Sequence, residues 1–527
     1  MHAELVVLAV LVGAGVFLVL ADRIGVPYPI LLTLGGTALA FLPGAGQVTL
    51  DPKIVLVAFL PPLLYSEAFF GSLQDMRANL RPIGLLAVGL VIATTVTVAV
   101  VAHAVIPGMP WTAAFVLGAI VSPTDPVAAV EIATRVRAPR RLVAIAQGES
   151  LVNDATGLIA YKFAVAAAVS GAFSMWSAIG QFFIDSAVGI GIGLAIGAAI
   201  AELRRRLDDA PTEIAVSVLT PYLAYLPAEA LGVSAVLAAV TSGLYLGWRS
   251  PELVTPSTRI QAFAFWEIFV FGLNAGLFVL VGLQLRQVLS GLDGFSAGQL
   301  TGYAGVVVGT VIVTRFAWTF PLTYLPRMLL PRLRERDPSP DWRLPALLGW
   351  MGMRGAVSLA AALAIPLHTA TGAPFPARDL IIFLAYAVIL ATVVGQGATL
   401  HRLLELAAVY EDEETTAEQE ARARIAAAEA ALERLDELSG EDWVRDETHE
   451  RMRNLYRYRI RRFEARLDED DDGDLEQGSQ AYQRLRREVL EAERREIIRR
   501  RNRGDITDDI MRRLERDLDL EDARLEI

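Results

Sequence analysis

The chain has 527 residues, of which 54% are hydrophobic, and its formal net charge is −11. A mean hydropathy of +0.42 is too high for a soluble protein of this size. No cysteine is present, which excludes disulfides and thiolate metal sites. The first apolar run, residues 5–20, has no basic segment before it, so we interpret it as a membrane helix rather than a cleavable signal.

The charged residues divide the chain into two parts. Residues 1–400 carry 23 Lys and Arg and 22 Asp and Glu, a net charge of +1, whereas residues 401–527 carry 25 and 37, a net charge of −12. We therefore predict a transmembrane domain over 1–400 and a charged, helical cytoplasmic tail over 401–527. The acidic balance argues against a nucleic-acid partner.

Apolar segments of membrane-spanning length follow one another along the first part, since a spanning helix needs about 20 apolar residues. About thirteen spans are expected, at 3–21, 27–42, 53–70, 82–106, 111–133, 141–169, 178–203, 212–227, 231–248, 263–286, 301–328, 343–367 and 378–400. These segments predict an all-α polytopic membrane protein. In the tail, the helical period predicts amphipathic helices over 421–438 and 483–501.

Basic residues in the loops indicate how the chain lies in the cell membrane. One set of alternate loops holds seventeen: Arg23, Arg77, Arg81, Arg135, Arg137, Arg140, Arg141, Arg204, Arg205, Arg206, Arg249, Arg259, Arg327, Arg332, Arg334, Arg336 and Arg343. The other set holds three: Lys53, Arg286 and Arg378. By the positive-inside rule the first set is cytoplasmic, which places the N-terminus outside and the tail inside.

The fifth span contains Ser-Pro-Thr-Asp-Pro at 122–126. Two prolines within one turn remove backbone donors and disrupt a helix, and freed carbonyls at membrane depth are tolerated where they line a wet cavity. Transporters place ion sites in such discontinuous helices. Asp125 lies in this break, and Thr124 precedes it. The alternative is a simple proline kink capped by the carboxylate.

The sixth span carries Glu149, Ser150, Asn153 and Asp154. Residues 150, 153 and 154 share one helix face, which offers a hydroxyl, an amide and a carboxylate. Hard cations such as Na⁺ take oxygen ligands of this kind. Because desolvation disfavours a charged carboxylate, Asp154 could hold a proton and a cation in turn. We therefore predict a Na⁺ site at Asp125 and Asp154.

Buried basic residues are expected to pair with the remaining acids. Arg315, in the eleventh span, and Arg354, between two glycines in the twelfth, are the candidates to meet Glu149. The glycines loosen the twelfth span, so the fifth and twelfth form a pair of broken helices typical of an inverted repeat. Both arginines could instead hold helices together. Glu67 is a further buried acid, with pairing to a cytoplasmic arginine as the alternative.

Taken together, these motifs resemble the monovalent cation:proton antiporter family 1, the bacterial and eukaryotic sodium/proton exchangers. The matching residues are the stretches 122–126, 148–154 and 352–356, together with Arg315. The resemblance implies thirteen helices, an outside N-terminus, a homodimer, and a six-helix core that moves against a dimerisation domain. It also implies transport of Na⁺ and H⁺ with no cofactor.

The resemblance also assigns roles to single residues. Asp154 would bind cation and proton in turn, and the residues completing or flanking the site would be Asp125, the Thr124 main chain, Ser150 and Glu67. Glu149 would pair with an arginine, and Arg315 is the first choice. Asn153 stands where electrogenic relatives have a second Asp, which implies electroneutral exchange of one cation for one proton.

From these residues we expect a secondary active antiporter that exchanges Na⁺, or Li⁺ or K⁺, for H⁺ by alternating access. A K⁺/H⁺ antiporter is the main alternative, since oxygen ligands alone do not separate Na⁺ from K⁺. A cation channel would need a filter or a ring of charges, and a membrane sensor would need an output domain; neither pattern is seen. No nucleophile–base pair or metal cluster emerges, so an enzyme is not expected.

Overall fold

The computed structural model describes residues 27–41, 55–171, 175–292, 294–331, 339–407, 413–467 and 474–525, with isolated positions at 12–24, 335 and 337. The chain divides into two compact units, Met1–Tyr410 and Glu411–Ile527. Each predicted span after the first overlaps one helix or two or three consecutive helices. The first, 3–21, lies largely outside the described residues.

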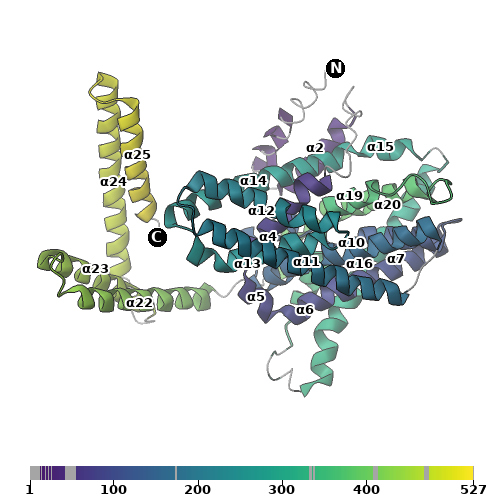
Figure 1. Ribbon diagram of the computed structural model, residues 1–527, viewed down its shortest axis with the longest axis horizontal. Helices are drawn as coiled ribbons and strands as arrows, with labels where there is room; N and C mark the ends of the chain where they lie inside the picture. Colours follow the sequence, from purple (N-terminus) through teal and green to yellow (C-terminus); the bar gives the residue numbers. More distant parts are fainter. Residues whose placement is uncertain are drawn as a thin grey trace. The chain divides into compact units, whose positions relative to one another are not determined.

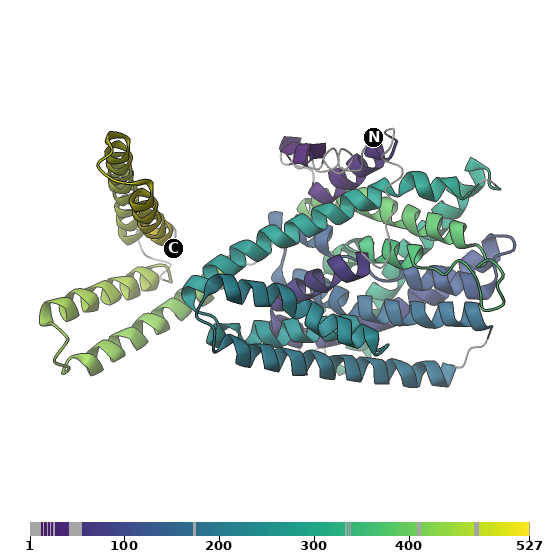
Figure 2. The ribbon, with the colours of Figure 1, turned by 45° about the horizontal axis from the view of Figure 1, so that its top comes forward.

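Two sets of helices make up the larger unit. The first bundle consists of α2 (Tyr28–Leu39), η2 (Val55–Phe59), α4 (Leu60–Phe70), α11 (Met175–Arg204), α12 (Ala210–Ala230), α13 (Ala235–Leu253) and α14 (Pro256–Leu283). Within it α13 packs against α4 and α11, and α14 packs against α2. Figures 1 and 2 show α11 and α13 running side by side.

The second bundle holds the remaining helices of this unit. They are α5 (Leu73–Ala78), α6 (Leu80–Gly84), η3 (Leu85–Leu90), α7 (Val91–Val105), α8 (Trp111–Val121), α9 (Val127–Arg135), α10 (Arg140–Ser170), α15 (Leu285–Ser290), α16 (Ala297–Leu329), α18 (Arg343–Trp350), α19 (Ala356–Leu363), α20 (Arg378–Leu390), η4 (Ala391–Gln396) and α21 (Gly397–Ala407). In it α8 packs against α7, α10, α19 and α20, so α8 lies at the centre.

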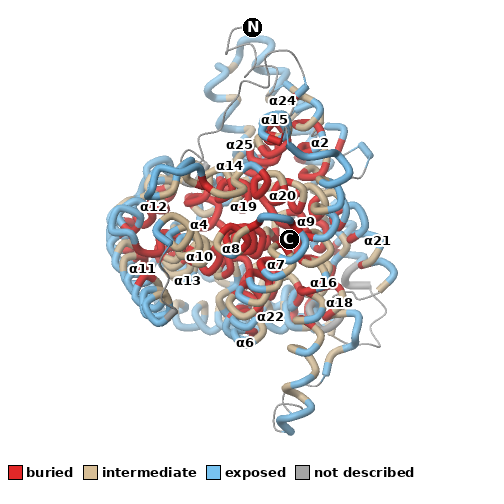
Figure 3. The backbone as a smooth tube through the Cα atoms, turned by 90° about the vertical axis from the view of Figure 1, so that its right-hand side faces the viewer, coloured by how far each residue is buried: buried red, intermediate tan, exposed pale blue. Residues whose placement is uncertain are grey.

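The buried and exposed faces are those of a membrane protein. Buried residues gather on α8, α19 and α20, whereas α11 and α12 present exposed residues outward (Figure 3). The exposed side chains of α11 are themselves apolar and include Trp176, Phe183 and Ile184, at 84%, 66% and 56% exposure. A surface of this kind is stable against lipid. Among the described residues, five helices are long and apolar enough to cross a membrane, and the all-α membrane fold is confirmed.

Helix breaks occur where the sequence predicts them. The prolines at 123 and 126 separate α8 from α9, and an extended segment over 351–355 separates α18 from α19. The two breaks meet, because the backbone N–H of Asp125 donates to the carbonyl of Met353 at 2.8 Å. Pro61 and Pro62, in the third predicted span, lie in the first turn of α4, directly after the π-helical η2.

Ion pairs hold Asp337, which lies between α16 and α18. Arg327 donates to the Asp337 carboxylate at 2.5 Å, and Arg141 donates to it at 3.2 and 3.3 Å. Burial raises the pKa of the Asp337 carboxyl, but the hydrogen bonds and charges of the two arginines outweigh burial and hold the pKa below its usual value.

The smaller unit is a pair of helical hairpins. It contains α22 (Glu413–Leu438), α23 (Asp446–Ala465), α24 (Asp474–Arg503) and α25 (Asp508–Leu525), and α22 packs against α23 as α24 packs against α25. The predicted helices 421–438 and 483–501 lie inside α22 and α24. The sequence reading did not separate out α23. Between α24 and α25 the chain turns at Gly504, whose φ of +80° suits glycine.

Candidate functional site

Asp125 lies where the two broken helices cross. Its carboxylate accepts the N–H of Val127, the first residue of α9, at 3.0 Å, and also the N–H of Ala356, the first residue of α19. A helix N-terminus carries roughly half a positive charge, so one carboxylate offsets two such ends. A Cβ atom at Gly355 would lie 1.6 Å from Asp125 Oδ2. The close approach therefore requires glycine at this position.

A cavity of about 50 Å³ adjoins this crossing and lies between the two bundles. From the second bundle it is lined by Thr124, Asp125, Ser150 and Asp154, and from the first by Glu67. Asp154 and Ser150 come from α10 and are 6% and 2% exposed. The structure thus brings all five residues of the predicted cation and proton site to one enclosed space. A volume of this size holds a water molecule or a small ion.

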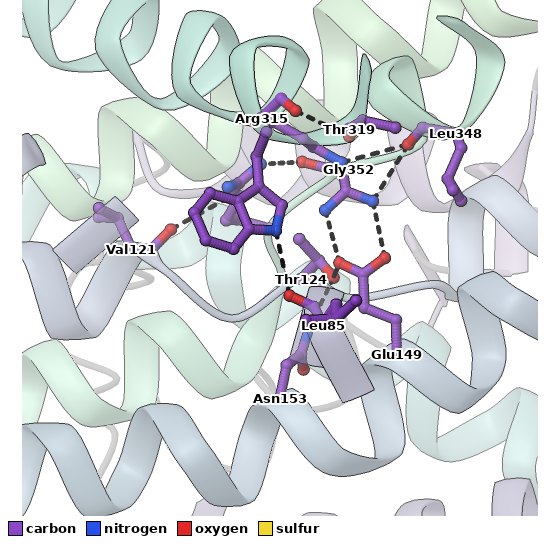
Figure 4. Close-up of polar contacts among 11 residues, drawn as sticks. Leu85, Val121, Thr124, Glu149, Asn153, Arg315, Thr319, Leu348 and Gly352 are labelled. Carbon is purple, nitrogen blue, oxygen red and sulfur yellow. Dashed lines mark hydrogen bonds and ion pairs between the residues drawn. The ribbon is translucent and has the colours of Figure 1, made fainter. Parts of the chain in front are cut away.

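Behind the cavity, Glu149 and Arg315 form a buried ion pair (Figure 4). Arg315 Nη1 and Nη2 donate to Glu149 Oε1 and Oε2 at 2.5 and 2.9 Å, and both side chains are almost fully buried. Arg315 Nε and Nη2 also donate to the carbonyl of Leu348, at 3.2 and 3.1 Å. The pair therefore joins α10 to α16 and to α18.

A short chain of hydrogen bonds links this pair to the helix break. The Thr124 hydroxyl donates to Glu149 Oε1 at 3.1 Å, and Asn153 Nδ2 donates to the Thr124 hydroxyl at 2.7 Å. Figure 4 shows the three side chains in line below Arg315. The Thr124 hydroxyl thus donates one hydrogen bond and accepts one. A role for its main-chain carbonyl in binding a cation stays a prediction.

Among the residues that the structure describes, Arg354 forms no ion pair with an acid. Its Nε donates to the carbonyl of Val121, the last residue of α8, at 3.0 Å, and its Nη1 donates to the carbonyl of Gly352. The backbone N–H of Arg354 donates to the Thr392 hydroxyl of η4 at 3.0 Å. A cation at the C-terminal end of a helix is favourable, so Arg354 caps α8 and shapes the second break.

Two cavity residues were missed by the sequence analysis. Asn274 of α14 and Ser358 of α19 both line the cavity and are 6% and 2% exposed. Asn274 could have been noticed as the one amide within the apolar run 262–283. Ser358 carried no signal, since serine is common in membrane helices. Within the described residues no three His, Cys, Asp or Glu side chains form a metal cluster.

Comparison with known proteins gives the family. Residues 6–406 match the family model described as "Sodium/hydrogen exchanger, transmembrane". The chain belongs to the sodium/hydrogen exchanger family. This match spans nearly all of the larger unit, so the cavity and both broken helices lie within the exchanger region.

Individual relatives agree with the assignment. The exchanger is 38% identical over 526 residues to the "Uncharacterized Na(+)/H(+) exchanger Rv2287" of Mycobacterium tuberculosis, covering 99% of this chain and 96% of that protein. It is 36% identical over 379 residues to the "Sodium, potassium, lithium and rubidium/H(+) antiporter" of Bacillus subtilis, covering 70% of this chain and 56% of that protein.

The fold of the exchanger also matches a solved structure. The sodium proton antiporter MjNhaP1 from Methanocaldococcus jannaschii superposes with a TM-score of 0.60 at 18% identity, covering 78% of this chain and 99% of that one. At this identity the match shows a shared fold. The exchanger is thus a membrane-embedded transporter and not an enzyme.

Proposed function

We propose that this exchanger transports one Na⁺ against one H⁺ across the cell membrane, with Asp154 holding either ion but not both. The observation that carries the proposal is the enclosed cavity at which Asp154, Ser150 and Thr124 meet. Carboxylate, hydroxyl and carbonyl oxygens suit a hard cation. Competition for a single carboxylate couples the two fluxes, because each ligand shifts the equilibrium only through its differential affinity.

Alternating access follows from where the cavity lies. Glu67 and Asn274 belong to the first bundle, whereas Asp125, Ser150 and Asp154 belong to the second. A displacement of the second bundle against the first would therefore open the cavity to one side of the membrane and then to the other. The crossed breaks and Arg354 hold α8, α9, α18 and α19 together, which supports movement of the second bundle as one body.

Asn153 supports the one-to-one stoichiometry. Its amide is used as a donor to Thr124 at 2.7 Å, and an amide does not gain or lose a proton in the transport cycle. Asp125 is held by backbone N–H groups at the starts of α9 and α19, which favours a role in holding the two breaks together. Asp154 is then the one carboxylate of the second bundle that faces the cavity without such donors among the described contacts.

The wider arrangement is proposed on the same basis. We infer a homodimer with the N-terminus outside, and a cytoplasmic tail from the basic loops counted above. The substrates are monovalent cations and protons, with no cofactor. K⁺ is the second candidate cation, because the Bacillus subtilis relative is named as an antiporter of sodium, potassium, lithium and rubidium.

The test is proton flux in proteoliposomes, read with an enclosed pH dye after addition of Na⁺, K⁺ or Li⁺. We expect Asp154→Asn to lower Na⁺-driven proton flux at least 100-fold while the protein stays folded. Asp185→Asn is the matched control, since Asp185 is also buried at 7% exposure in a membrane helix but does not line the cavity. Exchange by Asp154→Asn at the wild-type rate would refute the proposal.

A further inference from the structure

Ser358 is the hydroxyl that α19 presents to the cavity. It is the third residue of α19, is 2% exposed and lines the cavity wall. Several other buried serines of the membrane helices donate to a carbonyl of the preceding turn: Ser66, Ser122 and Ser242 do so at 2.8, 3.0 and 2.8 Å. Within the described residues no such bond is recorded for Ser358, nor for Ser150. The two serines that line the cavity are therefore alike in this respect.

A hydroxyl in the cavity wall that has no protein partner is available to whatever occupies the cavity, an ion or a water molecule. The cavity is large enough for an ion with about one water molecule. Both serine hydroxyls reach this space from different helices, Ser150 from α10 and Ser358 from α19. Each of the two serines therefore has a hydroxyl oxygen that can contact an ion or a water molecule in the cavity.

Within the second bundle, the remaining oxygens of the cavity do not complete a cation shell. The Asp125 carboxylate accepts two backbone N–H groups, and the Thr124 hydroxyl is used by Glu149 and Asn153. What remains in the second bundle is the Asp154 carboxylate, the Ser150 hydroxyl and the Thr124 carbonyl, about four oxygens in all. Hard cations usually take about six. Glu67 and Asn274 of the first bundle bring further oxygens to the cavity, and Ser358 of α19 is a further oxygen that belongs to the second bundle.

We propose that Ser358 is a ligand of the transported cation and a determinant of the preference among alkali cations, an inference that rests on the proposed antiport. Ser358 belongs to the second bundle, so it travels with Asp154 and can bind the cation in both orientations of the site. Glu67 and Asn274 belong to the first bundle, and their contact with the cation depends on orientation. A larger cation needs more ligands, so loss of this oxygen weighs more on K⁺ than on Li⁺.

The first experiment measures exchange kinetics for Na⁺, K⁺ and Li⁺ in proteoliposomes. For Ser358→Ala we expect an apparent KM for Na⁺ about tenfold higher, a larger rise for K⁺, a smaller one for Li⁺, and a maximal rate within about twofold of wild type. Ser358→Thr keeps the hydroxyl and should restore the KM. Ser242→Ala is the control, because that serine is buried in α13 and bonded to the Ala239 carbonyl. An unchanged KM for all three cations would overturn the proposal.

A second experiment does not depend on transport. The chain contains no cysteine, so Ser358→Cys introduces a single thiol whose labelling by a small methanethiosulfonate reagent can be followed in detergent. Na⁺, compared with choline, should slow the labelling several-fold by occupying the site, and labelling of Ser242→Cys should not depend on Na⁺. Labelling at the same rate in both salts would refute a cation at Ser358.

The two experiments separate this inference from the proposed function. If wild type exchanges Na⁺ for H⁺ and Asp154→Asn does not, while Ser358→Ala keeps the KM values of wild type, the antiport stands and the role of Ser358 falls. If wild type shows no cation-driven proton flux, the proposed function itself falls.

Discussion

Removing Glu149 should destabilise the exchanger strongly while leaving its surface unchanged. The Glu149 and Arg315 side chains are 2% and 1% exposed and are joined by two hydrogen bonds. Deleting one partner of a buried pair leaves an uncompensated charge and costs about 3–5 kcal/mol. At roughly 2 °C per kcal/mol for a chain of this size, Glu149→Gln should lower the apparent Tm by roughly 6–10 °C.

The assay is thermal unfolding of the purified protein in detergent, for both single variants and for Glu149→Gln with Arg315→Gln. The double variant restores neutrality, so we expect it to be more stable than the sum of the single changes by about 2 kcal/mol or more. The exposed pair Glu202–Arg206, at 2.8 Å with side chains 53% and 74% exposed, is the matched control. An exposed pair contributes about 0–1 kcal/mol.

Two results would refute the reasoning. The first is a coupling between Glu149 and Arg315 no larger than that of the exposed control pair. The second is a Glu149→Gln variant that melts at the wild-type temperature. Leaving the buried guanidinium without its carboxylate should lower the free energy of unfolding.

Three further predictions concern the site and its surroundings. Gly355→Ala should reduce exchange at least tenfold by displacing the carboxylate beside it, whereas Gly309→Ala in α16, with open space around its Cβ position, should not; equal rates would contradict the crossing geometry. Asn153→Asp should add a titrating group and make exchange sensitive to membrane voltage, measured as current on a solid-supported membrane. If the variant gives no current, the amide at position 153 does not set the one-to-one stoichiometry. The pKa of Asp337 is lowered on folding, so its stabilisation is present above the unfolded value of about 3.9 and is lost as pH falls through the folded value. At pH 7 Asp337→Asn should therefore speed cleavage of the 331–343 loop by trypsin, and unchanged cleavage would show that the tie does not hold the loop.

The chemistry-bearing stretches of this chain could be predicted because carboxylates and prolines are rare in apolar helices. Asp125 and Asp154 were found from that contrast alone, and the structure places both on one cavity. The sequence offers Arg315 and Arg354 as partners for Glu149 and favours Arg315, and the structure shows the pair with Arg315. These features depend on residue type and on spacing within one helix, which a sequence displays directly.

Features that depend on packing between helices could not be predicted. Ser358 and Asn274 reach the cavity because α19 and α14 pack on either side of it, and nothing in their own neighbourhoods reveals this. Arg354 was expected beside the site, but its carbonyl partners at Val121 and Gly352 follow from the crossing of two distant breaks. The sequence analysis did not predict α23, although the apolar residues of this polar, arginine-rich helix recur with a helical period.

The sharing of Asp125 between the starts of α9 and α19 has a genetic consequence. One carboxylate accepts hydrogen bonds from the starts of two helices about 230 residues apart in the chain. A substitution at the start of α9 therefore also affects the start of α19. Harmful substitutions near residue 125 should accordingly be rescued by second-site suppressors around 353–356, and suppressors elsewhere in α9 should be rare.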